Sequence, residues 1–315
     1  MAEKKAMVTG GAGFIGSHIG DALIERGYEV AVIDNLSTGK EQNLPPDAAF
    51  YEIDIRDPSV AAIFEEEQPE LLFHLAAQMD VRKSVADPAY DADVNIGGTV
   101  NLLQAARAVG LRKTVYAATG GAMYGEPEDL PADEDTPIEP ICPYGISKAT
   151  VELYLELYRK LYGMAYTSLR FPNVYGPRQD PHGEAGVVAI FSQTMLGGEQ
   201  PKIFGDGTST RDYVYVDDIV AANMRAVEAA DGRCLNLGWG REVPVQRIFE
   251  GVRDAVGCEV EPRYVDERPG EVHRICLDAS RAREALGWEP TVEIDGGLRR
   301  SVEFYRRLNA GEISR

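Results

Sequence analysis

The chain has 315 residues, of which 44% are hydrophobic, enough to bury the core of one large α/β domain or of one domain with a smaller appendage. Its formal net charge of -19 argues against nucleic acid and anionic membranes as partners, and a phosphate-bearing substrate would need local positive groups. No stretch approaches the roughly 18 apolar residues of a membrane span, and no signal-peptide core follows Met1, so we expect a cytoplasmic protein.

Short apolar runs alternate with helical patterns through the first half of the chain. Strands are predicted at residues 6–9, 30–33, 71–75, 114–118 and 166–170, and helices at 15–26 and 145–162. Such alternation is typical of a parallel sheet covered by helices. We therefore predict a doubly wound, Rossmann-like α/β domain over residues 1–170.

The second half of the chain has a different pattern. Long loops rich in Gly, Pro and Asp occur at 173–186 and 205–211, and helices are expected near 187–196 and 216–229. Loops of that length inside a compact protein are commonly functional. We expect residues 171–315 to form mainly a smaller substrate-binding lobe, with about 216–240 returning to the first domain.

The cysteines lie far apart in the sequence, so they predict neither a disulfide framework nor a metal site. They are Cys142, Cys234, Cys258 and Cys276. We expect reduced thiols and no bound metal.

A glycine-rich turn follows the first predicted strand. Gly10, Gly13 and Gly16 lie between that strand and a predicted amphipathic helix, as a dinucleotide fingerprint requires. The glycines permit a tight turn and the close approach of a pyrophosphate, whose charge meets a helix N-terminus. Asp34 ends the second predicted strand, where its carboxylate can bind both ribose hydroxyls and repel a 2′-phosphate. These residues favour NAD over NADP, against the alternative that Asp34 only caps a turn with Asn35.

Tyr144 and Lys148 are four residues apart, on one face if the segment is helical. A nearby ammonium stabilises a phenolate, so Tyr144 could act as a base far below its usual pKa of about 10. A solvated pair on a surface helix would explain the spacing alone. Pro143 at a plausible helix start, and the dinucleotide fingerprint upstream, favour the catalytic interpretation.

Further stretches carry a resemblance to a known family, in an order and spacing that chance does not explain. They are residues 34–39 (DNLSTG), 74–78 (HLAAQ), 173–178 (NVYGPR), 211–214 (RDYV) and 268–271 (RPGE). With the glycine motif and the Tyr144/Lys148 pair, they make the chain similar over nearly its full length to the extended short-chain dehydrogenase/reductase family, and within it to the UDP-glucose 4-epimerases.

The resemblance implies a cofactor site. It would consist of Gly10, Gly13, Phe14, Ile15, Gly16, Asp34, Asn35, Ser37, Thr38, Gly39, Asp54, Ile55, Leu75, Ala76, Ala77, Gln78, Tyr144, Lys148 and Pro172. Asp54 and Ile55 would contact the adenine, Ala76 and Gln78 the pyrophosphate side. Lys148 would bind the nicotinamide ribose.

The same resemblance implies a UDP-hexose site and a homodimer. The substrate residues would be Thr119, Tyr144, Asn173, Arg178, Val187, Arg211, Arg268 and Ile275. Arg211 and Arg268 would face the diphosphate, because a protein with so large a negative charge needs the forked guanidinium donors to bind that group. The alternative is that both arginines only form weak ion pairs with surface carboxylates. The dimer would form through residues 97–109 and 145–162.

The family's reaction implies a net isomerisation. Tyr144 would take the proton of the sugar C4 hydroxyl while C4 gives a hydride to NAD, and the 4-keto sugar would turn over and receive the hydride on its other face. Tight cofactor binding and a firmly held nucleotide would keep the intermediate in place.

The sequence departs from the family at the helper hydroxyl. The usual Ser or Thr position is Gly120, so we assign the role to Thr119, whose alternative is a structural strand-end threonine. Related dehydratases and decarboxylases carry an acidic residue just before the Tyr-Gly step, where this chain has Gly121, Ala122 and Met123. Epimerisation is therefore favoured over lyase chemistry.

Alternatives remain open: a 4-epimerase of UDP-N-acetylglucosamine or UDP-glucuronate, a nucleotide-sugar dehydratase, or a non-catalytic NAD-binding regulator. In related epimerases a bulky tyrosine blocks N-acetylated sugars. Ile275, beside Cys276, takes that position here and is smaller. We expect UDP-glucose and UDP-galactose as the main pair, with measurable activity on the N-acetylated pair.

Overall fold

The computed structural model describes residues 4–182, 186–267 and 272–315. At its centre is a seven-stranded parallel sheet with the order β11-β6-β5-β4-β1-β2-β3. Its strands are β1 (Lys5–Thr9), β2 (Glu29–Asp34), β3 (Ala49–Glu52), β4 (Leu71–His74), β5 (Lys113–Thr119), β6 (Ala165–Phe171) and β11 (Arg233–Asn236). The chain runs outward from β1 to β3 and then crosses to β4 on the other side of β1. This confirms the predicted doubly wound fold and puts a switch point, where such folds bind ligands, beside β1.

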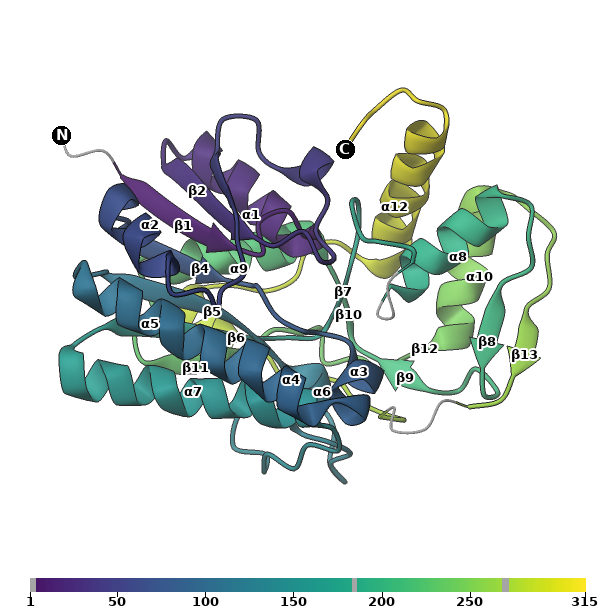
Figure 1. The fold of residues 1–315 in the computed structure, drawn as a ribbon. Coiled ribbons are helices and arrows are strands. Elements are labelled where there is room, and N and C mark those ends of the chain that lie inside the picture. Colours follow the sequence, from purple (N-terminus) through teal and green to yellow (C-terminus); the bar gives the residue numbers. More distant parts are fainter. Residues whose placement is uncertain (1–3, 183–185, 268–271) are drawn as a thin grey trace.

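Helices cover both faces of the sheet (Figure 1). One face carries α1 (Phe14–Glu25), α9 (Val216–Ala226) and α11 (Ser280–Leu286), and the other carries α2 (Val60–Glu67), α5 (Gly98–Ala108) and α7 (Pro143–Tyr162). Side chains of β1 alternate between the two cores, with Ala6 and Val8 in one and Met7 in the other. Near-continuous apolar strands follow from burial on both faces.

Short helices join β4 to α5 and β5 to α7. They are α3 (Val81–Ala86), α4 (Pro88–Ala92), the π-helix η2 (Asp93–Gly97) and α6 (Gly120–Met123). The side chain of Asp80 caps α3 by accepting from Lys83 N, and that of Asp87 caps α4 by accepting from Tyr90 N, with Pro88 in the first turn. These caps hold the α3–α4 segment at the carboxyl end of β4.

A second lobe packs beside the carboxyl ends of the sheet strands (Figure 1). It consists of β7 (Asn173–Tyr175), α8 (Val187–Leu196), β8 (Lys202–Phe204), β9 (Thr210–Arg211), β10 (Tyr213–Tyr215), β12 (Val243–Pro244), α10 (Val245–Val256), β13 (Arg263–Val265) and α12 (Ile294–Asn309), with the short 3-10 helix η1 (Glu41–Asn43) on the sheet side. The strands pair as β7 with β10, β9 with β12 and β8 with β13. Phe191, Phe249 and Leu298 join α8, α10 and α12 in a separate core.

The predicted elements of the first half are present, with small shifts at their ends; the helix predicted at 145–162, for example, begins at Pro143. In the second half, the helix predicted at 216–229 ends at Ala226. Two sheet strands were not predicted. β3 lies at an edge and has no buried residue, and β11 joins the opposite edge beside β6. Within the described residues, no helix has the length and apolar character needed to cross a membrane.

Candidate active site

The glycine loop brings the ends of β1 and β4 together. Gly10 has φ 71°, and a Cβ built on it would lie 2.8 Å from the backbone nitrogen of Ala76, while one on Gly16 would overlap the carbonyl oxygen of Gly10. Only glycine fits these two positions. The loop leads directly into α1, which begins at Phe14, so backbone N–H groups of a helix N-terminus face the turn.

Asp34 lies at the end of β2 beside this loop and is 7% exposed. Its carboxylate accepts from the backbone nitrogens of Ala12 at 3.0 Å and Leu36 at 2.9 Å, yet burial still raises its pKa. A Cβ at Gly39 would lie 2.9 Å from both carboxylate oxygens. Asn35 continues the cluster by donating to Oδ2 of Asp54 at 3.0 Å. The structure therefore brings these predicted cofactor residues together at the carboxyl ends of the strands.

A buried polar network links the segment after β4 to α7. Asp91, which is fully buried, accepts from Gln78 Nε2 and Asn95 Nδ2, both at 3.0 Å, and from Ser147 Oγ at 2.7 Å. Asn95 also accepts from Gln78 N at 2.8 Å and donates to its carbonyl at 2.9 Å. The sequence predicted Gln78 but missed Asp91, Asn95 and Ser147. Asn95 lies in the π-helix η2, and hydrophobic periodicity has no signal for one such turn.

The predicted catalytic pair lies at the start of α7. Lys148 is 3% exposed, donates to the carbonyl of Ala117 on β5 at 2.7 Å, and its Nζ lies 4.7 Å from the ring centroid of Tyr116 and 5.9 Å from that of Tyr144. Burial lowers the pKa of Lys148 to about 7 and raises that of the Tyr144 phenol. Burial, with smaller effects from Cys142 and Asp91, therefore raises the phenol pKa above its usual value rather than lowering it.

Two more predicted residues converge on this end. Thr119 ends β5 and Asn173 begins β7; Oγ1 of the first and Oδ1 of the second lie 3.8 and 3.7 Å from a Cβ built on Gly121. A Cβ on Gly145 would overlap the carbonyl oxygen of Ala122, so α6 packs directly against the first turn of α7. The geometry places a hydroxyl and an amide beside the helix turn that carries the phenol.

The arginines have different surroundings. Arg211, on β9, donates to the carbonyls of Thr210 at 2.8 Å and His273 at 3.2 Å, and no carboxylate of the described part of the chain pairs with it. Its guanidinium therefore remains open to a phosphate. Arg268 lies outside the described residues.

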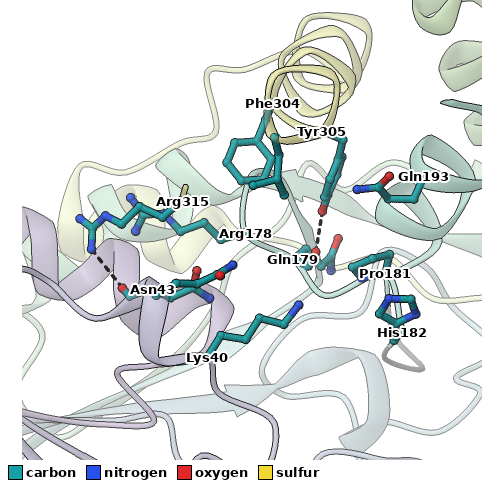
Figure 2. Close-up of a pocket in the computed structure, with 12 residues that line it drawn as sticks. Lys40, Asn43, Arg178, Gln179, Pro181, His182, Gln193, Phe304, Tyr305 and Arg315 are labelled. Atoms are coloured by element: carbon teal, nitrogen blue, oxygen red, sulfur yellow. Dashed lines mark hydrogen bonds between the residues drawn. The ribbon is translucent and has the colours of Figure 1, made fainter. Parts of the chain in front are cut away.

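Arg178 is engaged elsewhere. Its guanidinium pairs with Asp21 at 2.7 Å and donates to Ser17 Oγ at 3.2 Å, both on α1. Figure 2 shows it beside Arg315 at the wall of a cavity of about 150 Å³ whose lining includes Lys40 but not Tyr144 or Lys148. In this structure Arg178 thus joins the segment after β7 to α1, and its expected role in substrate binding stays a prediction.

Ile275 and Val187 border the second lobe. Ile275 is 2% exposed and packs with Tyr124 and Leu277, and its neighbour Arg274 forms a β-bridge with Thr210, next to Arg211. Val187 is half-buried at the first position of α8, and Pro172 joins β6 to β7. In the described residues no group of three or more His, Cys, Asp or Glu side chains could hold a metal ion, and all four cysteines are free thiols.

Known proteins resemble the chain over its length. It matches the family described as "NAD dependent epimerase/dehydratase" over residues 6–238. A putative UDP-glucose 4-epimerase of Methanocaldococcus jannaschii is 47% identical over 303 residues, 96% of this chain and 99% of that protein. The structure of a Thermotoga maritima UDP-glucose 4-epimerase with UDP-glucose has a TM-score of 0.95 and 50% identity, covering 97% of this chain and 99% of the other. A Thermus thermophilus UDP-glucose 4-epimerase in complex with NAD has a TM-score of 0.91 and 44% identity, covering 96% and 99%.

Proposed function

Because the chain belongs to the NAD dependent epimerase/dehydratase family, we propose that it is an NAD-dependent 4-epimerase, which interconverts UDP-glucose and UDP-galactose through a transient 4-keto sugar. One observation carries the proposal: the first turns of α7 bring Tyr144 and the buried Lys148 close to Thr119 and Asn173. The glycine loop after β1 and the carboxylate of Asp34 at the end of β2 lie at the same end of the sheet. Relatives named for this reaction support it. A role in galactose metabolism would follow from that pair of sugars.

The residues present fit NAD. The Gly10 turn is a cradle that a Cβ would fill, and it faces the N-terminus of α1, as a pyrophosphate site requires. Asp34, against whose carboxylate only a glycine fits at position 39, would bind the adenosine ribose and repel a 2′-phosphate. Lys148 would hold the second ribose. When bound, NAD would supply reversible hydride transfer at C4 of the sugar.

The chain's own residues would move the proton and hold the substrate. Tyr144 would accept the proton of the C4 hydroxyl, and the positive charge of the oxidised nicotinamide, added to that of Lys148, would oppose the desolvation that raises the phenol pKa. Thr119 would hydrogen-bond the same hydroxyl. Arg211 would fix the diphosphate, so that the keto sugar can turn without leaving.

Lyase chemistry is less consistent with this site. A dehydratase must add or remove protons at neighbouring carbons, which requires an additional acid or base. α6, which packs directly against the first turn of α7, has the sequence GGAM and carries no carboxylate. We therefore retain UDP-glucose and UDP-galactose as the main pair of substrates. We also expect measurable turnover of the N-acetylated pair, because Ile275 is smaller than the tyrosine that blocks such sugars.

We further propose a homodimer built on α5 and α7, which lie side by side (Figure 1). Four large apolar side chains of α7 are exposed by 45% to 73%: Ile146, Leu153, Leu157 and Leu161. Their spacing places them on one solvent-facing stripe. A partner's α7 against this stripe would remove it from water, and sedimentation equilibrium would give the mass of two chains.

Replacing the proposed base tests the reaction. Tyr144→Phe should lower the interconversion of UDP-glucose and UDP-galactose by at least about 10²-fold while bound NAD is retained, since general base catalysis contributes about 10² to 10⁴. Products are identified by chromatography, and NAD is measured after release from the protein. Tyr162→Phe, at the exposed end of the same helix, is the matched control and should keep full activity. Near-normal turnover by Tyr144→Phe would remove the phenol from the mechanism.

A further inference from the structure

Two adjacent glycines at the end of β5 have different surroundings. Gly120 is buried, and a Cβ built on it would lie 2.8 Å from Cδ2 and 3.1 Å from Cγ of Leu277, and would overlap Cδ1. A Cβ on Gly121 meets nothing closer than Asn173 Oδ1 at 3.7 Å and Thr119 Oγ1 at 3.8 Å. A side chain at position 120 therefore requires Leu277 to move, whereas one at 121 finds space.

Leu277 has no room to withdraw. It is 1% exposed and packs against Tyr124 and Ala132 in a small apolar core. Its backbone nitrogen donates to Oδ2 of Asp212 at 3.2 Å. Behind it, a Cβ built on Gly238 would lie 3.0 Å from the Leu277 Cβ. Packing and hydrogen bonds thus fix the leucine against position 120.

The side chain of Thr119 borders the open side of the turn. Its Oγ1 and Oδ1 of Asn173 border the space above Gly121, and α6 presses on the turn of α7 that carries Tyr144. Position 120, where related enzymes usually carry the helper hydroxyl, faces the leucine instead. The two positions cannot exchange roles while Leu277 keeps its place.

From this geometry we infer that Leu277 is a positioning residue: it fills the volume of a side chain at Gly120 and so makes Thr119 the source of the substrate-binding hydroxyl. The inference rests on the proposed function, because that hydroxyl matters only if a sugar reacts at this site. Gly120 and Leu277 are then a complementary pair, in which a larger residue at one position demands a smaller one at the other.

A double-mutant cycle in thermal stability tests the steric part without any activity assay. Gly120→Ser should lower the Tm by about 5 °C in the wild-type background and much less in Leu277→Ala, which lacks Cγ and both Cδ atoms. Gly121→Ser, the same change into open space, is the matched control and should alter the Tm little in either background. If Gly120→Ser alone does not fold, recovery of a cooperative transition in Gly120→Ser/Leu277→Ala supports the pairing. An equal loss in both backgrounds would overturn it.

Rescue of the hydroxyl tests the catalytic part. Thr119→Ala should lower kcat for UDP-galactose by about 10²-fold and leave the affinity for UDP unchanged. Adding Gly120→Ser and Leu277→Ala should restore kcat by at least about 10-fold, since the serine then has room to replace the lost donor. The triple variant with Gly120→Ala instead has the same backbone without a hydroxyl and should remain at the level of Thr119→Ala. Equal kcat in the two triple variants, or full activity in Thr119→Ala, would refute the assignment.

The two measurements separate this inference from the proposed function. A wild-type protein that does not convert UDP-galactose would overturn the proposed function together with the role of Thr119, while the Tm cycle would still report the packing of Gly120 on Leu277. An active wild type with an additive Tm cycle would refute the pairing alone.

Discussion

Replacing Lys148 with methionine should stabilise the protein freed of bound nucleotide while abolishing its catalysis. The lysine is 3% exposed, and within the described part of the chain its ammonium makes one hydrogen bond, from Nζ to the carbonyl of Ala117 at 2.7 Å. No carboxylate of the described residues lies within ion-pair distance, and Asp91 raises its pKa only from farther away. Burial dominates and lowers the pKa of Lys148 from 10.5 to about 7.

That displacement sets the magnitude. At about 1.4 kcal/mol per pKa unit, holding the ammonium at this site costs at most about 5 kcal/mol relative to the neutral amine. Between about pH 7 and 10.5 the unfolded chain binds more protons at this lysine than the folded one, so stability rises with pH there; below about pH 7 the whole cost is present. Methionine removes the charge but forgoes the bond to Ala117, a loss of about 1 to 3 kcal/mol at every pH.

Urea unfolding at two pH values tests this reasoning. Methionine should raise the free energy of unfolding by roughly 2 to 4 kcal/mol at pH 6, and the gain should vanish or reverse near pH 9.5. The difference between the two proteins cancels the other titrating groups, and unchanged m-values would show that the unfolded states are comparable. A difference that is the same at both pH values would refute the buried ammonium as its cause.

Three further substitutions follow from the structure. Asp34→Ala should narrow the preference for NAD over NADP, measured by titration of both nucleotides; preferential binding of NADP by the wild type would contradict the ribose assignment. Arg211→Ala should weaken UDP binding by roughly 1 to 3 kcal/mol in calorimetry, whereas Arg241→Ala, which removes an exposed ion pair, should not. Glu152→Ala should lower the free energy of unfolding by about 3 to 5 kcal/mol, because it leaves the buried guanidinium of Arg170, 2.7 Å away, without its charged partner. Joint replacement of both by apolar residues should recover most of that loss, and an additive double mutant would rule out coupling.

Local sequence patterns predicted most of the strands and helices of the first domain. The strands around β1 and the helix that starts at Pro143 are specified by apolar spacing and by a proline, signals that lie within a few residues of each other. The edge strand β3 escaped prediction because none of its residues is buried, so no apolar pattern marks it. The ion pair of Arg178 with Asp21 could not be predicted for a related reason, since the two residues lie far apart in the sequence and are brought together by packing against α1.

By itself the sequence determined the doubly wound fold, the dinucleotide turn, the carboxylate of Asp34 and the Tyr144–Lys148 helix face, because these depend on residue spacing within single elements or short motifs. Only the tertiary structure decided the surroundings of those groups. It buried Lys148 far enough to lower its pKa to about 7, and it set Leu277 against Gly120 so that the open side of the turn belongs to Thr119. Desolvation and steric exclusion depend on atoms from distant segments, which only the packed sheet and the second lobe bring to the same place.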